Sequence, residues 1–159
     1  MKRIICLLFV LSVVVGCSKS DASIHRKMAA AAYYYQDGDA GRFFTFYLVE
    51  NKSNLVQNPD DLNAMKAANY VMIDVCSEAE TPQGSYSLIN PFHDIMTGEA
   101  HAYDNCRRRE HGYIISGTIE IGDNTIAISG TMDNGREYSL SYSGPFQQTG
   151  FITTLVKAL

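Results

Sequence analysis

The most regular feature of the chain is an alternation of apolar and polar residues over residues 113–144. Apolar side chains recur at every second position in three segments, and the turn sequences Gly122-Asp123-Asn124 and Asp133-Asn134-Gly135 separate these segments. Successive side chains of a strand point to opposite faces, so this period indicates strands with one buried face. Asn and Asp next to Gly favour tight turns between such strands. We therefore predict a three-stranded antiparallel meander. The residues predicted to share its buried face are Ile115, Ile119, Ile126, Ile128, Leu140 and Tyr142.

Within the meander, the sequence Ile-Ser-Gly-Thr occurs at residues 115–118 and again at residues 128–131. Two copies are too few for a repeat architecture. Glycine inside a strand is typical of a place where the sheet bends or where a bulky neighbour crosses. We interpret the echo as a feature of two neighbouring strands and not as a binding site.

The residues before the meander predict further strands. Residues 28–50 resemble a hairpin, in which an aromatic strand, a Gly- and Asp-rich breaker at 37–41 and a second aromatic strand follow one another. Residues 67–76 are apolar on both faces, which is typical of a central strand. The remaining predicted elements are strands at 85–88, 100–104 and 151–156 and a short helical turn near 60–66. About eight strands predict an all-β fold, either an antiparallel sandwich or a squat barrel.

The first residues predict export and lipidation. Lys2 and Arg3 precede an apolar run at 4–15, which is too short to span a membrane and is typical of a signal peptide. The run ends in Val14-Val15-Gly16-Cys17, which resembles the lipobox of bacterial lipoproteins, where the cysteine thiol is linked to diacylglycerol. An ordinary secretory signal is the alternative. We therefore expect a signal peptide at 1–16, a lipidated Cys17, a flexible tether at 17–27 and a single β domain at 28–159.

Charge excludes one class of partner. Cleavage before Cys17 removes Lys2 and Arg3, so 11 basic residues face 17 acidic residues and the net charge falls from −4 to −6. A mildly acidic chain is not typical of nucleic-acid-binding proteins. The expected membrane contact is the lipid anchor.

Candidate chemistry is sparse. The chain contains no G-x-S-x-G, H-E-x-x-H or C-x-x-C motif and no phosphate-binding glycine loop. His93, His101 and His111 are weak metal candidates, because their spacings of eight and ten match no regular zinc pattern. A solvated polar loop with scattered imidazoles is the alternative. We predict no cofactor. A hydrolase or metal-dependent enzyme that uses the segment 93–111 stays as the alternative to a non-enzymatic module.

Tyrosine is the strongest hint of a ligand. The chain has ten Tyr, seven Phe and no Trp. Tyrosines that line a sheet face or a barrel mouth suit a glycan or another small amphipathic ligand, because they offer ring stacking and hydroxyl hydrogen bonds. The candidates are Tyr33, Tyr35 and Tyr47. The alternative is that tyrosine fills half-buried strand positions.

Two cysteines predict a disulfide. With Cys6 removed and Cys17 lipidated, Cys76 and Cys106 are left in an oxidising compartment, where paired cysteines persist. A bridge between them would fasten the irregular segment 90–110 to the sheet. The alternative is that both are isolated buried side chains.

Several short motifs together resemble a known group of proteins. They are the lipobox, the aromatic strands at 33–49, Pro-x-Gly-x-Tyr at 82–86, and the closing Ser-Gly-Thr, Asn-Gly and Tyr-Ser-Gly sequences at 116–144. This pattern is similar to that of small β-rich lipoproteins of unknown function from Gram-negative gut anaerobes. The resemblance implies a calycin-like or sandwich-like domain on a lipid tether. By resemblance to enterobacterial lipoproteins, Ser18 favours the outer membrane, and the leaflet stays open. No catalytic residue is implied, so we expect an envelope protein that acts as a ligand-binding or interaction module.

Overall fold

The computed structural model describes residues 23–52, 69–106 and 110–149. The predicted signal peptide, Cys17, the helical turn near 60–66 and the edge strand at 151–156 lie outside these residues. The described part of the chain is all-β, which confirms the predicted class, and it contains ten strands. They are β1 (Ile24–Lys27), β2 (Ala30–Gly38), β3 (Gly41–Val49), β4 (Tyr70–Ser77), β5 (Gly84–Leu88), β6 (Glu99–Asp104), β7 (Gly112–Ile121), β8 (Thr125–Met132), β9 (Glu137–Ser143) and β10 (Phe146–Gln148).

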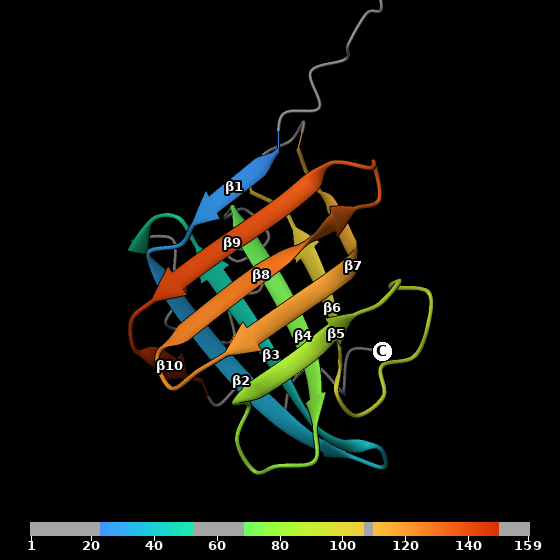
Figure 1. Ribbon diagram of the computed structural model, residues 1–159. Coiled ribbons are helices and arrows are strands. Elements are labelled where there is room, and N and C mark those ends of the chain that lie inside the picture. The colour runs from blue at the N-terminus through green and yellow to red at the C-terminus, as the bar shows by residue number, and fades with distance from the viewer. Residues whose placement is uncertain (1–22, 53–68, 107–109, 150–159) are drawn as a thin grey trace, which may run out of the picture.

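The ten strands form one sheet that curls into a half-barrel. Their order is β1-β9-β8-β7-β5-β6-β4-β3-β2-β10, and β6 also pairs with β7. The predicted hairpin is β2–β3 and the predicted meander is β7–β9, both antiparallel. In Figure 1 the meander lies in front of β2, β3 and β4, so the two halves of the curled sheet face each other across one core.

The chain itself joins the two margins of the sheet. Strand β1 pairs in parallel with β9 and then continues into β2, while β10 follows β9 and pairs in parallel with β2. At the first crossing, the amide of Met28 donates to the carbonyl of Ser141 (2.9 Å) and the next amide, of Ala29, donates to that of Val49 (2.8 Å). Between β1 and β2 the backbone therefore changes its hydrogen-bonding partner from β9 to β3 over two consecutive residues. This crossing links the two margins of the sheet and keeps the half-barrel curled.

The first strand corrects one predicted boundary. The tether predicted for residues 17–27 includes β1, in which Ile24 and Arg26 are buried. Residues 24–27 are also mainly polar, so composition alone does not separate them from residues 18–23, although buried and exposed positions alternate along β1. The folded domain therefore begins before residue 28.

The core is built from the inward faces of strands on both sides of the curl. Phe44, Phe46 and Leu48 of β3 lie against the inward residues of β4, and all are almost fully inaccessible to solvent. Of the meander residues predicted to be buried, Ile119, Ile126, Ile128, Leu140 and Tyr142 are confirmed.

Ile115 is the exception. The register between β7 and β8 shifts between Ile114 and Ser116, as in a β-bulge, so Ile114 takes the fully buried position and Ile115 is half-buried. A bulge moves the following side chains to the other face of the strand, and strict alternation across it therefore fails.

The bulge leads directly into the paired glycines of the Ile-Ser-Gly-Thr echo. Gly117 and Gly130 are register partners in β7 and β8. A Cβ atom on Gly117 would overlap the carbonyl oxygen of Ser129, and one on Gly130 would overlap that of Ser116. Gly117 also has a φ of 125°, a conformation that side chains rarely adopt. The two backbones approach too closely for any side chain, so the echo marks a contact between neighbouring strands.

We expect Gly117→Ala to lower the free energy of unfolding by about 1–3 kcal/mol, because the new methyl group adds backbone strain at a site that cannot relax. Urea unfolding of the full chain measures the change. Thr118→Ala is the control, since Thr118 is exposed on the same strand, and it should cost less than about 1 kcal/mol. Equal losses in the two variants would contradict the close approach.

The predicted disulfide is wrong. Cys76 lies near the end of β4, whereas Cys106 follows β6, where the amide of the adjacent Asn105 donates to the carbonyl of Tyr70 at the start of β4. Six residues of strand separate these ends, about 20 Å at roughly 3.3 Å per residue, far beyond the span of a disulfide. Both cysteines are free and buried, and burial raises the pKa of the Cys106 thiol to about 12.

Candidate functional site

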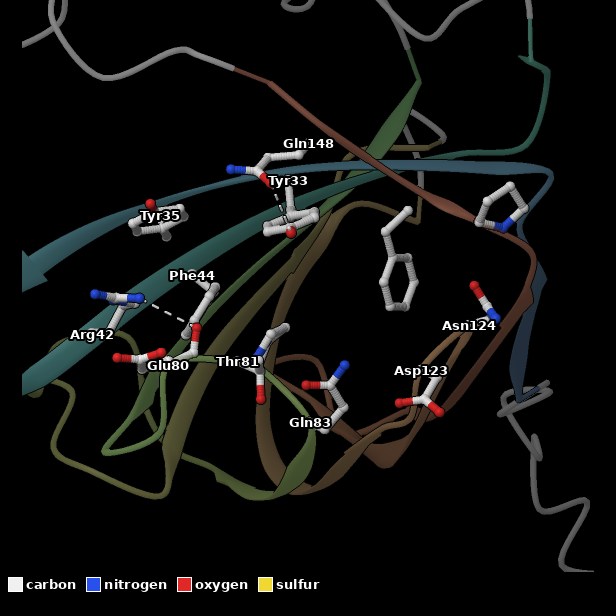
Figure 2. Close-up of a pocket in the computed structure, with 13 residues that line it drawn as sticks. Tyr33, Tyr35, Arg42, Phe44, Glu80, Thr81, Gln83, Asp123, Asn124 and Gln148 are labelled. Carbon is white, nitrogen blue, oxygen red and sulfur yellow. Dashed lines mark hydrogen bonds between the residues drawn. The ribbon is translucent and has the colours of Figure 1, made fainter.

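A cavity of about 450 Å³ opens at one mouth of the half-barrel (Figure 2). Four separate parts of the chain meet there: the β2–β3 hairpin, the β4–β5 connection, the β7–β8 turn and the β9–β10 bend. The lining residues are Tyr33, Tyr35, Arg42, Phe44, Glu80, Thr81, Pro82, Gln83, Asp123, Asn124, Pro145, Phe146 and Gln148.

Strand register places the aromatic residues of this cavity. Tyr33 lies opposite Phe46 and Tyr35 lies opposite Phe44 in the β2–β3 ladder. Directly paired residues point to the same face, so all four rings are on the inward side. Along the edge of β2 that faces away from β3, the described neighbour is the three-residue strand β10, which starts at Phe146. The two tyrosines therefore stay half-buried and reach the cavity.

The rings support one another. The ring of Tyr33 stacks on that of Phe46 with centroids 5.4 Å apart, and the ring of Phe146 meets Phe46 edge-on at 5.5 Å. Phe146 also stacks against Tyr142 at 5.7 Å. Rings held by such contacts form a wall whose orientation is set before any ligand arrives.

Two buried tyrosine hydroxyls fix the loops of the mouth. The hydroxyl of Tyr86 donates to the carbonyl of Pro82 in the β4–β5 connection (2.8 Å), and that of Tyr142 donates to the carbonyl of Pro145 in the β9–β10 bend (2.7 Å). The amide of Gly144 donates to the carbonyl of Asn124 (2.8 Å), which ties this bend to the β7–β8 turn. The rim is thus attached to the sheet at several points.

The rim contains one described cation, Arg42, whose guanidinium contacts other groups of the protein. Its Nε donates to Asp37 (2.6 Å), its Nη1 donates to the backbone carbonyl of Glu80 (3.3 Å), and its guanidinium lies 4.7 Å from the ring centre of Tyr35. The hydrogen bond to Asp37 raises the pKa of the Arg42 guanidinium. Arg42 therefore forms part of the wall of the cavity.

The other polar groups of the rim are carboxylates, amides and hydroxyls. Gln148 accepts a long hydrogen bond from the hydroxyl of Tyr33 (3.4 Å). The side-chain carboxylates of Glu80 and Asp123 form no hydrogen bond or ion pair with other described residues. In Figure 2 they lie on different sides of the mouth, with Thr81 and Gln83 drawn between them. Together with the rings, these groups offer stacking surfaces and hydrogen-bonding partners to one ligand.

Of the predicted ligand-binding tyrosines, the structure brings Tyr33 and Tyr35 together and places Tyr47 elsewhere. Tyr47 points to the outer face of β3, where its ring lies against those of Tyr34 and Tyr70. Burial raises the pKa of its hydroxyl. Paired residues on neighbouring strands point to the same face, and consecutive residues on one strand point to opposite faces. Tyr47 pairs with Ala32, which directly precedes Tyr33 on β2, so Tyr47 lies on the face opposite to Tyr33.

The predicted histidines do not surround a common point in the described structure. His93 is exposed in the β5–β6 connection, His101 lies on β6 opposite Asp74, and His111 lies just before β7. No group of three or more His, Cys, Asp or Glu side chains among the described residues is placed to hold a metal ion. Asp94 is exposed and Glu99 accepts a hydrogen bond from the amide of Met96. The described residues of this segment, 93–106 and 110–111, therefore do not bring the three predicted histidines together.

A buried ionic cluster escaped the sequence analysis. Arg26 of β1 donates through Nε to Asp104 of β6 (2.8 Å), and its Nη2 lies 3.2 Å from Glu110. The side chains of Arg26 and Asp104 are 2% and 0% exposed. Asp104 also accepts the amide of Cys106 (2.7 Å). Because Arg26 stands in a short polar segment, no local pattern distinguishes it from a surface residue.

Comparisons with known proteins give no relative. No protein-family model matches the chain, and neither a curated protein nor a solved structure is similar to it. Among the described residues, no helix is long and apolar enough to cross a membrane. The candidate site therefore rests on geometry alone.

Proposed function

We propose that this chain is a non-enzymatic binding module of the cell envelope and that it holds a carbohydrate in the cavity at the mouth of its half-barrel. The observation that carries the proposal is the pairing of an aromatic wall, formed by Tyr33, Tyr35 and Phe146, with a rim of hydrogen-bonding side chains. A sugar ring has apolar C–H faces and polar edges, and this cavity offers a partner for each.

The dimensions fit a small ligand. A volume of about 450 Å³ lies within the range typical of small-molecule sites, about 300–1,000 Å³. The rim offers both hydrogen-bond donors and hydrogen-bond acceptors. The side-chain amides of Gln83 and Asn124 donate and accept, and the carboxylates of Glu80 and Asp123 accept. Sugar hydroxyls, which also donate and accept, match such a set.

We expect Tyr33→Ala to weaken binding of a captured oligosaccharide about 2- to 12-fold, because an aromatic contact of this kind contributes roughly 0.5–1.5 kcal/mol. An oligosaccharide array that holds neutral, cationic and anionic members identifies the ligand. Isothermal titration of the full chain then measures the affinity of each variant.

Tyr34→Ala is the matched control. Tyr34 is the next residue of β2 and is also half-buried, but it points to the opposite face and stacks with Tyr47. The Tyr34→Ala variant should therefore bind the ligand with the affinity of the unmodified chain. Failure of every array member to bind, or an equal loss of affinity in the two variants, would overturn the proposal.

We further propose that Cys17 anchors the module to the outer membrane. The lipobox supports this proposal, and β1 follows it closely, with Ile24 as its first residue. Cys17→Ser is expected to abolish lipidation and to release the chain from the membrane fraction. Metabolic labelling with a fatty acid checks this result, and a wild-type chain that takes up no label would refute it.

A further inference from the structure

We infer that the mouth of the half-barrel selects its ligand by charge and prefers an amino sugar, in its ammonium form, to neutral and anionic sugars. This inference rests on the proposed carbohydrate-binding function and specifies its substrate class. Three features carry it: the pairing of Arg42 within the protein, the position of two carboxylates, and the aromatic wall beside them.

Among the described residues, the one cation that lines the cavity already has a partner. Arg42 forms its shortest contact with Asp37, donates also to the carbonyl of Glu80, and covers the ring of Tyr35. An anionic sugar would have to compete with Asp37 for the guanidinium. Arg42 therefore offers little to a carboxylate or sulfate on the ligand.

The two carboxylates are less closely paired. Glu80 and Asp123 stand on separate connections that meet at the cavity, and neither forms an ion pair with another described residue, although Glu80 is close enough to Arg42 to help raise the pKa of that guanidinium. The described charged residues that line the cavity are Arg42, Glu80 and Asp123. Because Asp37 already pairs with Arg42 from outside the lining, the negative charge of the two lining carboxylates is in excess. A concave site focuses this field, so a cation is attracted and an anion is repelled at the entrance.

The aromatic wall strengthens the same preference. Tyr33 and Tyr35 line the cavity beside these carboxylates (Figure 2). The face of an aromatic ring attracts a cation that lies within about 6 Å of its centre, and Arg42 already uses Tyr35 in this way. Rings for stacking and carboxylates for charge fit a ligand in which a sugar ring carries an ammonium group.

The test uses β-1,4-linked tetrasaccharides that differ mainly in charge. They are the glucosamine tetramer, its neutral N-acetylated form, the neutral glucose tetramer and the anionic glucuronate tetramer. Binding to the full chain is measured by isothermal titration at low ionic strength and at a pH below the pKa of the sugar amine. We expect the glucosamine tetramer to bind about 5- to 10-fold more tightly than the neutral forms, and the glucuronate tetramer to bind most weakly.

Two variants and one control assign the effect. Glu80→Gln and Asp123→Asn keep the shape of the mouth and should each reduce the preference for the ammonium form, and the double variant should abolish it. Glu137→Gln removes the same charge from an exposed position at the start of β9, away from this mouth, and should leave the preference unchanged. Added salt should weaken it in the unmodified chain, because salt screens exposed charges.

The outcomes separate this inference from the function on which it rests. Equal binding of the four tetramers, or tightest binding of the glucuronate form, would overturn the charge preference and leave carbohydrate binding in place. Binding of none of the tetramers or array members would overturn the carbohydrate-binding function itself. A preference that survives in the double variant would overturn the role of Glu80 and Asp123.

Discussion

Replacement of Asp104 by alanine is expected to lower the free energy of unfolding by about 3–5 kcal/mol, the range typical of a broken buried ion pair. Asp104 and Arg26 are both almost completely inaccessible to solvent and 2.8 Å apart. Without the carboxylate, the guanidinium stays buried, and the ion pairs left to it among the described residues are the longer contacts to Glu50 (3.8 Å) and Glu110 (3.2 Å). The amide of Cys106 also loses its acceptor.

Chemical denaturation of the full chain measures this loss. The informative control is the double variant Arg26→Met with Asp104→Leu, in which apolar side chains of similar size replace both charges. Such replacements of buried ion pairs are often neutral or stabilising, so the double variant should recover most of the stability that Asp104→Ala loses. A loss below about 1 kcal/mol for Asp104→Ala would contradict the buried pair.

Replacement of Phe46 by alanine is expected to cost about 3–5 kcal/mol, because it removes a fully buried ring and leaves a cavity in the core. Phe46 is 0% exposed. Its ring contacts those of Tyr33 and Phe146, which line the mouth. The same substitution should therefore also weaken ligand binding, since it withdraws the support of both rings.

Denaturant unfolding and titration with the ligand test the two effects separately. Phe43→Ala is the matched control, because Phe43 lies on the same strand, is only half-buried and points to the other face. The Phe43→Ala variant should lose less stability than Phe46→Ala and should keep its affinity for the ligand. Phe46→Leu should restore most of the stability but not the affinity, since it fills much of the volume without a ring to stack on. Identical behaviour of the Phe43 and Phe46 alanine variants would rule out this arrangement.

Much of the fold was predictable because local patterns determine it. The alternation over residues 113–144 and the turn residues between its segments predicted β7, β8 and β9, and the buried positions of Ile119, Ile126 and Ile128 are confirmed. The paired glycines of the echo also predicted a strand feature. In each case the residues that carry the signal are near one another in the chain.

The errors have non-local causes. Ile115 was misplaced because one extra residue in β7 reverses the faces on either side of it. The disulfide was inferred by elimination, yet the positions of Cys76 and Cys106 depend on how β4 and β6 pair. The tether was drawn too long because β1 is stabilised by β9 and by Asp104, both more than 70 positions away.

The candidate site was predictable only in part. The tyrosine-rich strand indicated Tyr33 and Tyr35, but the choice of Tyr47 ignored the face to which it points. Glu80 and Asp123 carry no signal of their own, because each lies in a connection between strands, where polar residues are expected. Gln148 lies at the end of the three-residue strand β10, which is too short to show a pattern. Their meeting at one mouth follows from the curl of the whole sheet.

The partner exchange between β1 and β2 has a mechanical consequence for an anchored chain. A force applied through Cys17 would enter the domain at Ile24 and run along β1. Because β1 pairs in parallel with β9, such a force loads several hydrogen bonds at once, in shear, instead of opening them one by one. The Arg26–Asp104 contact joins the same strand to β6. In a chain anchored at Cys17, the strand that first carries the force is thus held by both β9 and β6, and these contacts would resist the force before it reaches the mouth of the half-barrel.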